Sequence, residues 1–379
     1  MMVAGERSGD IYGAELAAAL RARLGEVEIF GCGGAEMRRA GVETVVDLRQ
    51  FAMVGITEVV SGLPRAYRAF RRLMDEARRH PPTLAILIDS PSLNIRLAGR
   101  LKRRGVPVTY FISPQIWAWK RWRLRQLKTM IDRMICIFDF EEEIYRRAGI
   151  PVEYVGHPLV DAVHPSLTRE RFFAQAGLDP EVTTVALLPG SRPIEVRSVL
   201  PTLLEAAARL AGTRHLQFVV AVAPTIDPAW LDARYLAPYR ERLALRTVTG
   251  AAHDALYHAD VAMVASGTAT IEAALLERPL VVVYRVSRVT AFLVRALGLR
   301  VPFYSMVNLL AGKAAVPELI QKDFTAARLA SEVARLLDDA GARERTVSGL
   351  RKVKARLGRA GAIQRAAEAI ARSGTGNRE

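Results

Sequence analysis

The sequence contains little that a disulfide-held or disordered protein would require. It has two cysteines in 379 residues, Cys32 and Cys136, which lie far apart in short apolar stretches. We interpret them as buried thiols of a protein in a reducing compartment, which excludes a small disulfide scaffold. Aromatic residues are few, at 7%, but 50% of the residues are apolar and 25% are charged, as in folded globular proteins. At roughly 100 to 200 residues per domain, the length predicts two domains.

Membrane spans and several catalytic signatures are also missing from the sequence. No apolar run approaches the roughly 18 residues of a membrane span, and the start, MMVAGERSGD, lacks the apolar stretch of a signal peptide. We therefore expect a cytoplasmic protein. The sequence has no D-x-D, no Walker loop, no G-x-S-x-G and no zinc-spaced histidines or cysteines. These absences disfavour a metal-held sugar donor, a P-loop enzyme and a serine hydrolase, and we expect neither a metal nor a cofactor.

Positive charge is in excess along the whole chain. Lysine and arginine number 54 against 39 aspartates and glutamates, a formal charge of +15. Residues 1–159 carry 25 basic and 18 acidic residues, or +7, and the remainder carries 29 and 21, or +8. Such an excess attracts polyanions, anionic lipid surfaces or phosphorylated small molecules. Both halves of the chain are therefore expected to face an anionic partner.

Short β-branched runs alternate with longer amphipathic stretches, which is typical of a parallel sheet with crossover helices. The pattern is interrupted by the proline- and glycine-containing segment 156–167 and then restarts. We predict an α/β protein with two Rossmann-like domains, residues 1–160 and 161–345, followed by a basic helix over 346–379. That helix either closes the second domain, crosses back to the first or is exchanged between subunits. The expected strands are 27–31, 84–88, 108–112 and 134–138, then 185–188, 216–222, 261–265 and 280–284.

Ligands of open α/β sheets bind beyond the carboxyl ends of the strands, so the residues there are candidate site residues. In AGERSGD (4–10), glycines beside a helix start suit an anion or a sugar hydroxyl, or form only a tight turn with a capping side chain. Asp89 directly follows an apolar run and precedes Pro91. It is a candidate general base, with a turn or cap aspartate as the alternative, and Asn94 is polar support or a first-turn residue.

The segment ISPQIWAWKRWR (112–123) combines a strand end with Ser113, Gln115 and three tryptophans. Ten basic residues and no acidic one lie between Arg96 and Lys128. This stretch suits a phosphate or an anionic membrane, and arginines interleaved with aromatics also resemble a nucleic-acid platform. The simpler interpretation is a solvated helix face with tryptophans in the core.

Two junctions in the second half suit phosphates. In LLPGSR, Gly190, Ser191 and Arg192 follow a buried strand and offer amides, a hydroxyl and a cation at a helix start. In ASGTATIEAAL, SGT (266–268) opens another helix, and Glu272 lies one turn along on the same face. Phosphate at the amides with ribose hydroxyls on Glu272 is the functional interpretation, and helix capping is the alternative. Two such junctions in one domain favour a nucleotide diphosphate.

Ordered motifs extend over nearly the whole chain: GERSGD (5–10), GCGGAEM (31–37), MVGITEVV (53–60), IDSP (88–91), SPQIWAW (113–119), DFEEEIY (139–145), VGHPL (155–159), LLPGSR (187–192), ASGTATIEAAL (265–275) and NLLAGKAAVPELIQ (308–321). With these motifs the sequence resembles the lipid-A-disaccharide synthases, bacterial glycosyltransferases of the GT-B fold. The resemblance implies two Rossmann-like domains around a cleft. It also implies inverting, metal-independent transfer of 2,3-diacylglucosamine from its UDP derivative to the 6-hydroxyl of 2,3-diacylglucosamine 1-phosphate.

The resemblance also implies roles for residues that match the family's motifs. Asp89 corresponds to the essential aspartate, and Arg192 to the arginine associated with UDP. Ser92 and Leu93 depart from the usual Asp-Phe, Asp139 replaces a usual proline, and the first strand is short, so that the true start lies upstream or is missing. We expect substrate contacts from Glu6, Ser8, Asn94, Gln115 and Gln321, and UDP contacts from Gly190, Ser191, Arg192, Ser266, Gly267, Thr268, Glu272 and Asn308.

Acylated, phosphorylated substrates imply a location on the cytosolic face of the inner membrane. The segment 51–64 and the basic stretch 65–72 are candidates for an interfacial contact, with packing inside the first domain as the alternative. A homodimer is a further expectation, and nucleic acid is not an expected partner. The alternatives are another UDP-sugar GT-B enzyme, such as a peptidoglycan N-acetylglucosaminyl transferase or an epimerase, or a basic nucleic-acid-binding protein.

Overall fold

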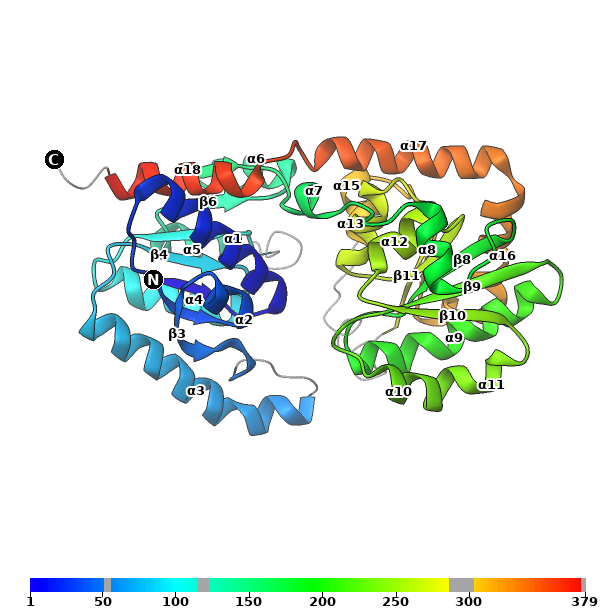
Figure 1. The fold of residues 1–379 in the computed structure, drawn as a ribbon. Coiled ribbons are helices and arrows are strands. Elements are labelled where there is room, and N and C mark those ends of the chain that lie inside the picture. Colours follow the sequence, from blue (N-terminus) through cyan, green and yellow to red (C-terminus); the bar gives the residue numbers. More distant parts are fainter. Residues whose placement is uncertain (51–55, 115–122, 286–302, 376–379) are drawn as a thin grey trace. The chain divides into compact units, whose positions relative to one another are not determined.

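A computed structural model describes residues 1–50, 56–114, 123–285 and 303–375 (Figure 1). The chain divides into two compact units. Unit 1 comprises residues 1–161 and 357–379, and unit 2 comprises residues 162–356. Each unit has its own hydrophobic core and its own parallel sheet. Among the described residues, no helix combines the length and the apolar character needed to cross a bilayer.

Unit 1 contains a seven-stranded parallel sheet in the order β3-β2-β1-β4-β5-β6-β7. Strands β4 and β5 are fully buried, because helices cover both faces of a parallel sheet and both rows of side chains must then be apolar. The strands are β1 (Met2–Ala4), β2 (Phe30–Gly33), β3 (Glu43–Asp47), β4 (Ala85–Ile88), β5 (Val108–Phe111), β6 (Arg133–Cys136) and β7 (Val152–Tyr154).

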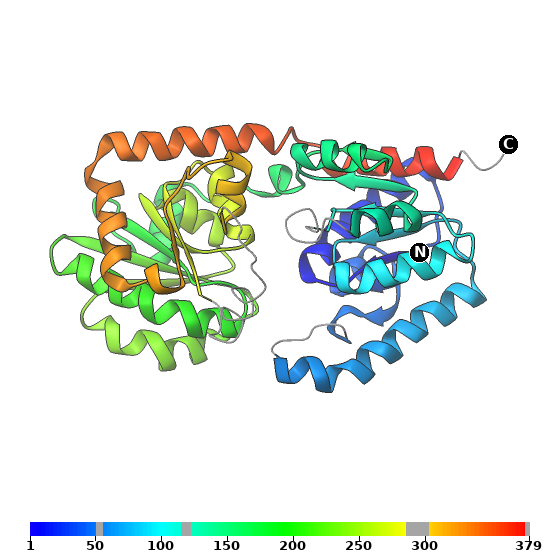
Figure 2. The same cartoon turned by 180° about the vertical axis from the view of Figure 1, so that it is seen from behind.

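Helices cover both faces of the unit 1 sheet. Helices α1 and α18, which pack on each other, lie on one face (Figure 1), and α4 and α5 lie on the other (Figure 2). The helices of unit 1 are α1 (Arg7–Leu24), α2 (Ala35–Arg39), α3 (Ile56–Arg79), α4 (Pro91–Lys102), α5 (Arg123–Met130), α6 (Asp139–Arg147), α7 (Leu159–Ala162) at its boundary, and α18 (Ala362–Thr375).

Unit 2 repeats the same winding in a six-stranded parallel sheet of order β10-β9-β8-β11-β12-β13. Helices α9 and α16 cover one face (Figure 2), and α12 and α13 cover the other (Figure 1). The strands are β8 (Thr183–Leu188), β9 (Leu216–Val222), β10 (Ala244–Thr249), β11 (Val261–Ala265), β12 (Leu280–Tyr284) and β13 (Glu318–Ile320). The main helices are α8 (Arg169–Ala176), α9 (Pro193–Ala211), α12 (Ala252–His258), α13 (Thr268–Leu275), α15 (Met306–Ala311), α16 (Ala326–Asp338) and α17 (Ala340–Arg356).

The strand order places a topological switch point in each sheet. In unit 1 the winding reverses between the neighbours β1 and β4, where Val3 pairs with Leu87. In unit 2 it reverses between β8 and β11, where Leu188 pairs with Val264. Connections leave these neighbouring strands toward opposite faces, which opens a crevice at their carboxyl ends. The switch points therefore bring AGERSGD beside Asp89, and LLPGSR beside SGT.

The expected single helix over 346–379 is two helices in the structure. Helix α17 ends at Arg356 in unit 2, and α18 begins at Ala362 in unit 1. Gly358 and Gly361 lie between them with φ of 87° and 88°, a conformation that ends a helix and that glycine adopts without strain. Helix α18 is fixed to unit 1 by Arg365, which donates two hydrogen bonds to the carbonyl of Val155.

Candidate active site

Asp89 occupies a strained turn at the switch point of unit 1. Strand β4 ends at Ile88, and Asp89 and Ser90 follow in left-handed conformation with φ of 48° and 46° before Pro91 starts α4. Non-glycine residues adopt this conformation only where surrounding contacts enforce it, and such positions cluster at functional sites. One of these contacts is a hydrogen bond of 3.0 Å from the Asp89 amide to the Phe111 carbonyl.

Two buried side chains hold the backbone of Asp89. The Tyr110 hydroxyl donates to the Asp89 carbonyl at 2.5 Å, and the Asn94 side-chain nitrogen donates to the same oxygen at 2.8 Å. The Asn94 nitrogen also donates to the Ile88 carbonyl at 2.9 Å. Because Asn94 is fully buried beneath the turn, the structure favours a positioning role over the substrate contact that we expected. These hydrogen bonds fix the backbone from which the Asp89 carboxylate extends.

The environment of Asp89 suits a general base. Burial raises the pKa of its carboxyl, and the negative charge of nearby Glu6 raises it further, to about 6. A carboxylate with this pKa is ionised at neutral pH yet basic enough to accept a proton in a transition state. Desolvation combined with a specific charge partner is typical of functional carboxylates.

Glu6 lies near Asp89 because two turns pack tightly. A Cβ placed on Gly5 would lie 2.1 Å from the Ser90 hydroxyl oxygen, so only glycine permits this approach. Glu6 is exposed at the N-cap of α1, and Ser8 is half-buried in the first turn of that helix. The structure therefore brings Glu6 and Asp89 together at one edge of the sheet, where the ends of β1 and β4 adjoin.

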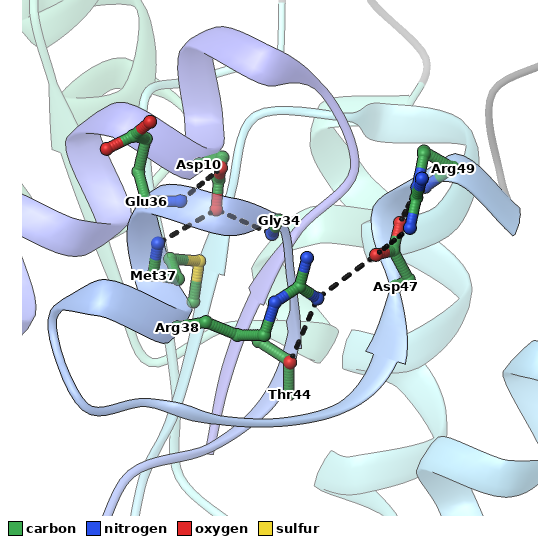
Figure 3. Close-up of polar contacts among 8 residues, drawn as sticks. All are labelled: Asp10, Gly34, Glu36, Met37, Arg38, Thr44, Asp47 and Arg49. Atoms are coloured by element: carbon green, nitrogen blue, oxygen red, sulfur yellow. Dashed lines mark hydrogen bonds and ion pairs between the residues drawn. The ribbon is translucent and has the colours of Figure 1, made fainter.

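Asp10 has a structural role near this edge of the sheet. Its buried carboxylate accepts hydrogen bonds from the amides of Gly34 at 2.6 Å, Glu36 at 3.1 Å and Met37 at 3.1 Å (Figure 3). It thus caps the N-terminus of α2, a contact between two packed helices rather than within its own helix. The motifs GERSGD and GCGGAEM are linked through this one carboxylate.

Beyond β5, buried Glu141 and Tyr145 of α6 hold the segment that leads into the tryptophan-rich motif. The Ser113 hydroxyl donates to the Glu141 carboxylate, and the Tyr145 hydroxyl donates to the Pro114 carbonyl at 3.2 Å. Gln115 and the three tryptophans, predicted as site residues or a basic platform, lie outside the described residues. Our sequence analysis did not select Glu141 as a site residue, although the motif DFEEEIY contained it.

In unit 2, the amides expected to bind a diphosphate at the start of α9 are engaged by a carboxylate. The Glu195 carboxylate accepts from the amides of Ser191 at 3.2 Å and Arg192 at 3.3 Å, and it lies 3.4 Å from the Arg192 guanidinium. A Cβ on Gly190 would lie 2.7 Å from the same carboxylate. The Arg192 side chain is 61% exposed, so the side chain rather than the loop amides is available to an anionic ligand.

The start of α13 differs, because no side chain of the described residues caps it. Gly267 is the N-cap and makes no side-chain cap, and a Cβ built on it meets no atom of the described residues within 4 Å. The Ser266 hydroxyl donates to the Tyr304 carbonyl at 3.3 Å. Uncapped amides and the positive end of a helix dipole together form an anion site, with Thr268 as the first helical residue. This junction fits the predicted phosphate contact.

Glu272 lies one turn into α13 and has a histidine partner. Its carboxylate is 3.8 Å from Nε2 of His253, the second residue of α12. The interaction raises the pKa of His253, with burial opposing it. His253 has no ligand partner at zinc spacing in the sequence, and no local pattern links it to Glu272. The pair holds Glu272 near the anion site, where a carboxylate accepts hydrogen bonds from sugar hydroxyls.

Asn308 and Gln321 have different surroundings. The Asn308 side-chain oxygen accepts from the amides of Ala315 and Val316, and its nitrogen donates to the Val316 carbonyl and the Glu318 carboxylate. These four bonds use the full capacity of the amide, which favours a positioning role over the predicted contact with UDP. Gln321 directly follows β13 with a φ of 53°, at the same edge of the sheet as the SGT turn.

Comparisons with known proteins extend this geometry. The family model for lipid-A-disaccharide synthetase matches residues 1–372. A lipid-A-disaccharide synthase of Myxococcus xanthus is 46% identical over 371 residues, covering 98% of this chain and 96% of that protein. A lipid-A-disaccharide synthase of Solibacter usitatus is 44% identical over 374 residues, with 98% and 96% covered.

Solved structures show the fold at much lower identity. A Listeria monocytogenes structure described as a putative UDP-N-acetylglucosamine 2-epimerase aligns with a TM-score of 0.65 and 16% identity, covering 98% of this chain and 95% of that one. The calicheamicin glycosyltransferase CalG4 aligns with a TM-score of 0.56 and 15% identity, covering 97% and 96%. The predicted GT-B class, with two parallel-sheet α/β units, is confirmed.

Proposed function

The chain belongs to the lipid-A-disaccharide synthase family of glycosyltransferases, and from this premise we propose the reaction that its residues perform. The donor is UDP-2,3-diacylglucosamine and the acceptor is 2,3-diacylglucosamine 1-phosphate. The products are the β-1,6-linked disaccharide 1-phosphate and UDP. The observation that carries the proposal is Asp89, a carboxylate at the switch point of unit 1 with its pKa raised to about 6.

Asp89 acts as the general base of an inverting transfer. The acceptor 6-hydroxyl oxygen attacks the anomeric carbon of the donor from the face opposite UDP and forms the new C–O bond. Its proton passes to the Asp89 carboxylate, and the bond between the anomeric carbon and the UDP oxygen breaks with its electron pair on UDP. A positioned base contributes typically about 10² to 10⁴-fold to such a step. Residues 1–160 therefore bind the acceptor, with Glu6 and Ser8 beside the reacting hydroxyl.

Unit 2 stabilises the leaving UDP. Negative charge develops on the diphosphate as the donor bond breaks, and Arg192 together with the amides of α13 neutralises that charge without a metal ion. The uncapped start of α13 and the exposed guanidinium of Arg192 support this role. Glu272 accepts hydrogen bonds from the ribose hydroxyls, held by His253. Residues 161–345 are thus the nucleotide-binding part of the chain.

A basic face on unit 1 supports a peripheral location on the cytosolic side of the inner membrane. Helices α3 and α4 border a groove of about 690 Å³ that combines apolar and cationic side chains, including Tyr67, Phe70, Arg71, Arg100 and Arg104. Arginines beside exposed aromatic residues suit an anionic membrane surface. The segment 51–64 is another candidate for the interfacial contact. The side chains of residues 51–63 lie outside the described residues.

The membrane contact is tested by reversing charges on α3. Arg68, Arg71 and Arg72 replaced by glutamate should lower binding to vesicles that contain anionic phospholipid, because each basic residue near such a surface contributes about 1 kcal/mol. Binding to neutral vesicles is the control. Unchanged binding to anionic vesicles would locate the contact elsewhere.

The reaction is tested with the purified chain, both proposed substrates, detergent and EDTA. The proposal predicts disaccharide and UDP in equal amounts. UDP binding without product would point to another sugar acceptor. Interconversion of UDP-sugars without transfer would point to an epimerase. Steeply salt-dependent binding of single-stranded nucleic acid with no affinity for UDP would replace the enzyme with a nucleic-acid-binding protein.

A further inference from the structure

A second pocket of unit 2 lies at the opposite end of the sheet from the proposed nucleotide site. It has a volume of about 580 Å³ and includes Pro279, the residue just before β12 begins. Four parts of the chain form it: residues 163–165, Tyr257 of α12, the end of α13 with the turn to β12, and one side of α17. All four parts belong to unit 2. Neither the proposed base nor the proposed UDP contacts reach this pocket.

The lining of this pocket is strongly cationic. Arg278, Arg343, Arg351 and Lys354 contribute four positive charges, and Glu277 is the carboxylate among the lining residues. Glu277 is already shared, because Arg351 lies 2.9 Å and Lys354 lies 2.8 Å from its two oxygens. Glu344 lies 3.2 Å from Arg351, and Asp260 lies 3.7 Å from Arg343. The four cations still exceed these three carboxylates in charge, and a bound anion offsets the excess.

Arg278 supplies an unused donor in this cluster. Its guanidinium donates to the Tyr257 carbonyl and lies 5.8 Å from the centre of the Tyr257 ring. Within the part of the chain that the structure describes, its buried Nε has no hydrogen-bond partner. Burial lowers the pKa of Arg278, and the charge of Arg343 adds to the shift while Asp260 opposes it. A buried donor without a partner is costly in the absence of a ligand.

We propose that this pocket binds a phosphate group, carried either by inorganic phosphate or by a small sugar phosphate. A tetrahedral phosphate accepts hydrogen bonds from several guanidinium groups at once, which matches an arginine-rich lining. Apolar side chains of Val163, Leu276 and Val347 leave room for an attached sugar. This site is independent of the transfer reaction proposed above.

The position of the pocket gives such a ligand a structural effect. Residues 163–165 are the first of unit 2 after its boundary, and Arg351 and Lys354 lie in the last two turns of α17 before the chain leaves the unit. A phosphate that bridges these segments fixes both points where the chain enters and leaves unit 2. Phosphate therefore raises the thermal stability of unit 2 by mass action.

The test is calorimetric titration of the full chain with inorganic phosphate and, separately, with N-acetylglucosamine 1-phosphate, both in saturating UDP and a phosphate-free buffer. UDP occupies the nucleotide site, and the heat that is lost on substitution of the pocket residues separates this pocket from the acceptor site of unit 1. We expect one phosphate site per chain that depends on these residues. Tighter binding of N-acetylglucosamine 1-phosphate identifies a sugar phosphate as the ligand class, and equal affinities identify phosphate alone. Absence of binding by both probes overturns the proposal.

Three substitutions locate the site. Arg278→Gln and Arg343→Gln should each weaken binding at least about tenfold, since each removes a charge-assisted hydrogen-bond donor. Arg345→Gln is the matched control, because Arg345 is on the same helix as Arg343 but its side chain is 73% exposed. Equal loss in the control and the pocket variants would contradict the site.

A variant with higher affinity for phosphate distinguishes loss of the site from failure to fold. Glu277→Gln removes the carboxylate that competes for Arg351 and Lys354, and we expect severalfold tighter phosphate binding. If the cluster is only a structural ion-pair network, Glu277→Gln lowers the melting temperature and leaves phosphate binding absent.

Discussion

The carboxyl edges of the two sheets have the same topology and opposite chemistry. Both sheets reverse their winding at the switch point, β1 beside β4 in unit 1 and β8 beside β11 in unit 2. At the first edge Asp89 and Glu6 lie close together, and burial together with the charge of Glu6 disfavours the negative charge of Asp89. At the second edge, Arg192 and an uncapped helix start favour negative charge. The fold thus determines where the two proposed sites lie. The residues of the turns determine whether each site suits proton transfer or phosphate binding.

The two helix starts of unit 2 show the same lesson on a smaller scale. Both follow buried strands with a glycine and a serine, so the sequence predicts equal phosphate sites. In the structure Glu195 fills the first with its carboxylate, while the start of α13 has no side-chain cap. We infer that α13 provides the amides for a phosphate and that α9 provides the Arg192 side chain.

The largest expected effect comes from the acidic edge. Asp89→Asn should lower turnover by about 10² to 10⁴-fold, because the amide cannot accept the proton of the acceptor hydroxyl. Affinity for UDP should stay within about twofold, since Asp89 belongs to the other edge. Measuring kcat and the Kd of UDP checks both statements. Glu43→Gln, which changes an exposed carboxylate of β3, is the control that should leave both unchanged.

The next effect comes from the cationic edge. Arg192→Gln should weaken UDP binding by about 10 to 100-fold, because a hydrogen bond from a charged donor contributes about 1.5 to 3 kcal/mol. Arg192→Lys should recover part of this affinity, as a point charge lacks the bidentate geometry. Calorimetry with UDP measures both. Arg209→Gln, at the far end of the same helix, should bind UDP like the parent chain.

Stability provides a third contrast. The pKa of Asp89 is higher in the folded chain, about 6, than in an unfolded one, about 4, so its carboxyl favours folding below pH 4 and loses that contribution as pH rises through 6. Asp89→Asn should therefore raise the free energy of unfolding by about 1 to 3 kcal/mol at pH 7 and change it little at pH 4. Urea unfolding at both pH values tests this. A lower free energy of unfolding for Asp89→Asn at pH 7 would show that the ionised Asp89 carboxylate does not destabilise the folded chain.

The smallest expected effect is a shift of the pH profile. Turnover requires ionised Asp89, so kcat/KM should fall as pH drops below about 6. Glu6→Gln removes the neighbouring negative charge, so the pKa of Asp89 falls and the acidic limb moves to lower pH. Glu28→Gln, which removes an exposed carboxylate of unit 1, is the control. An unmoved limb in Glu6→Gln would separate Glu6 from the base.

Much of this arrangement could be predicted from the sequence because buried parallel strands are continuous apolar runs. The runs at 84–88 and 261–265 locate β4 and β11, and with them Asp89 and the SGT turn. The edge strands β3, β7, β10 and β13 were not predicted, because strands at a sheet edge are only partly buried and lack such runs.

Contacts between distant segments could not be predicted from local pattern. Asp10 looks like a cap of its own helix, yet it caps α2, a contact that only the sheet order creates. Asn94 and Asn308 were expected to touch ligands, and both make hydrogen bonds to backbone groups in buried surroundings. Sequence spacing identifies the motif, whereas folding decides which side chain of the motif supports and which projects.

The central proposal is that the edge of unit 1 supplies the base and the edge of unit 2 binds UDP. It is tested most directly by comparing Asp89→Asn with Arg192→Gln. For both variants, we would measure UDP affinity and the single-turnover rate of disaccharide formation at saturating substrate. We expect Asp89→Asn to lose rate and keep UDP affinity, and Arg192→Gln to lose UDP affinity by the larger factor of the two. Parallel losses of rate and affinity in Asp89→Asn, or near-normal turnover in that variant, would contradict it.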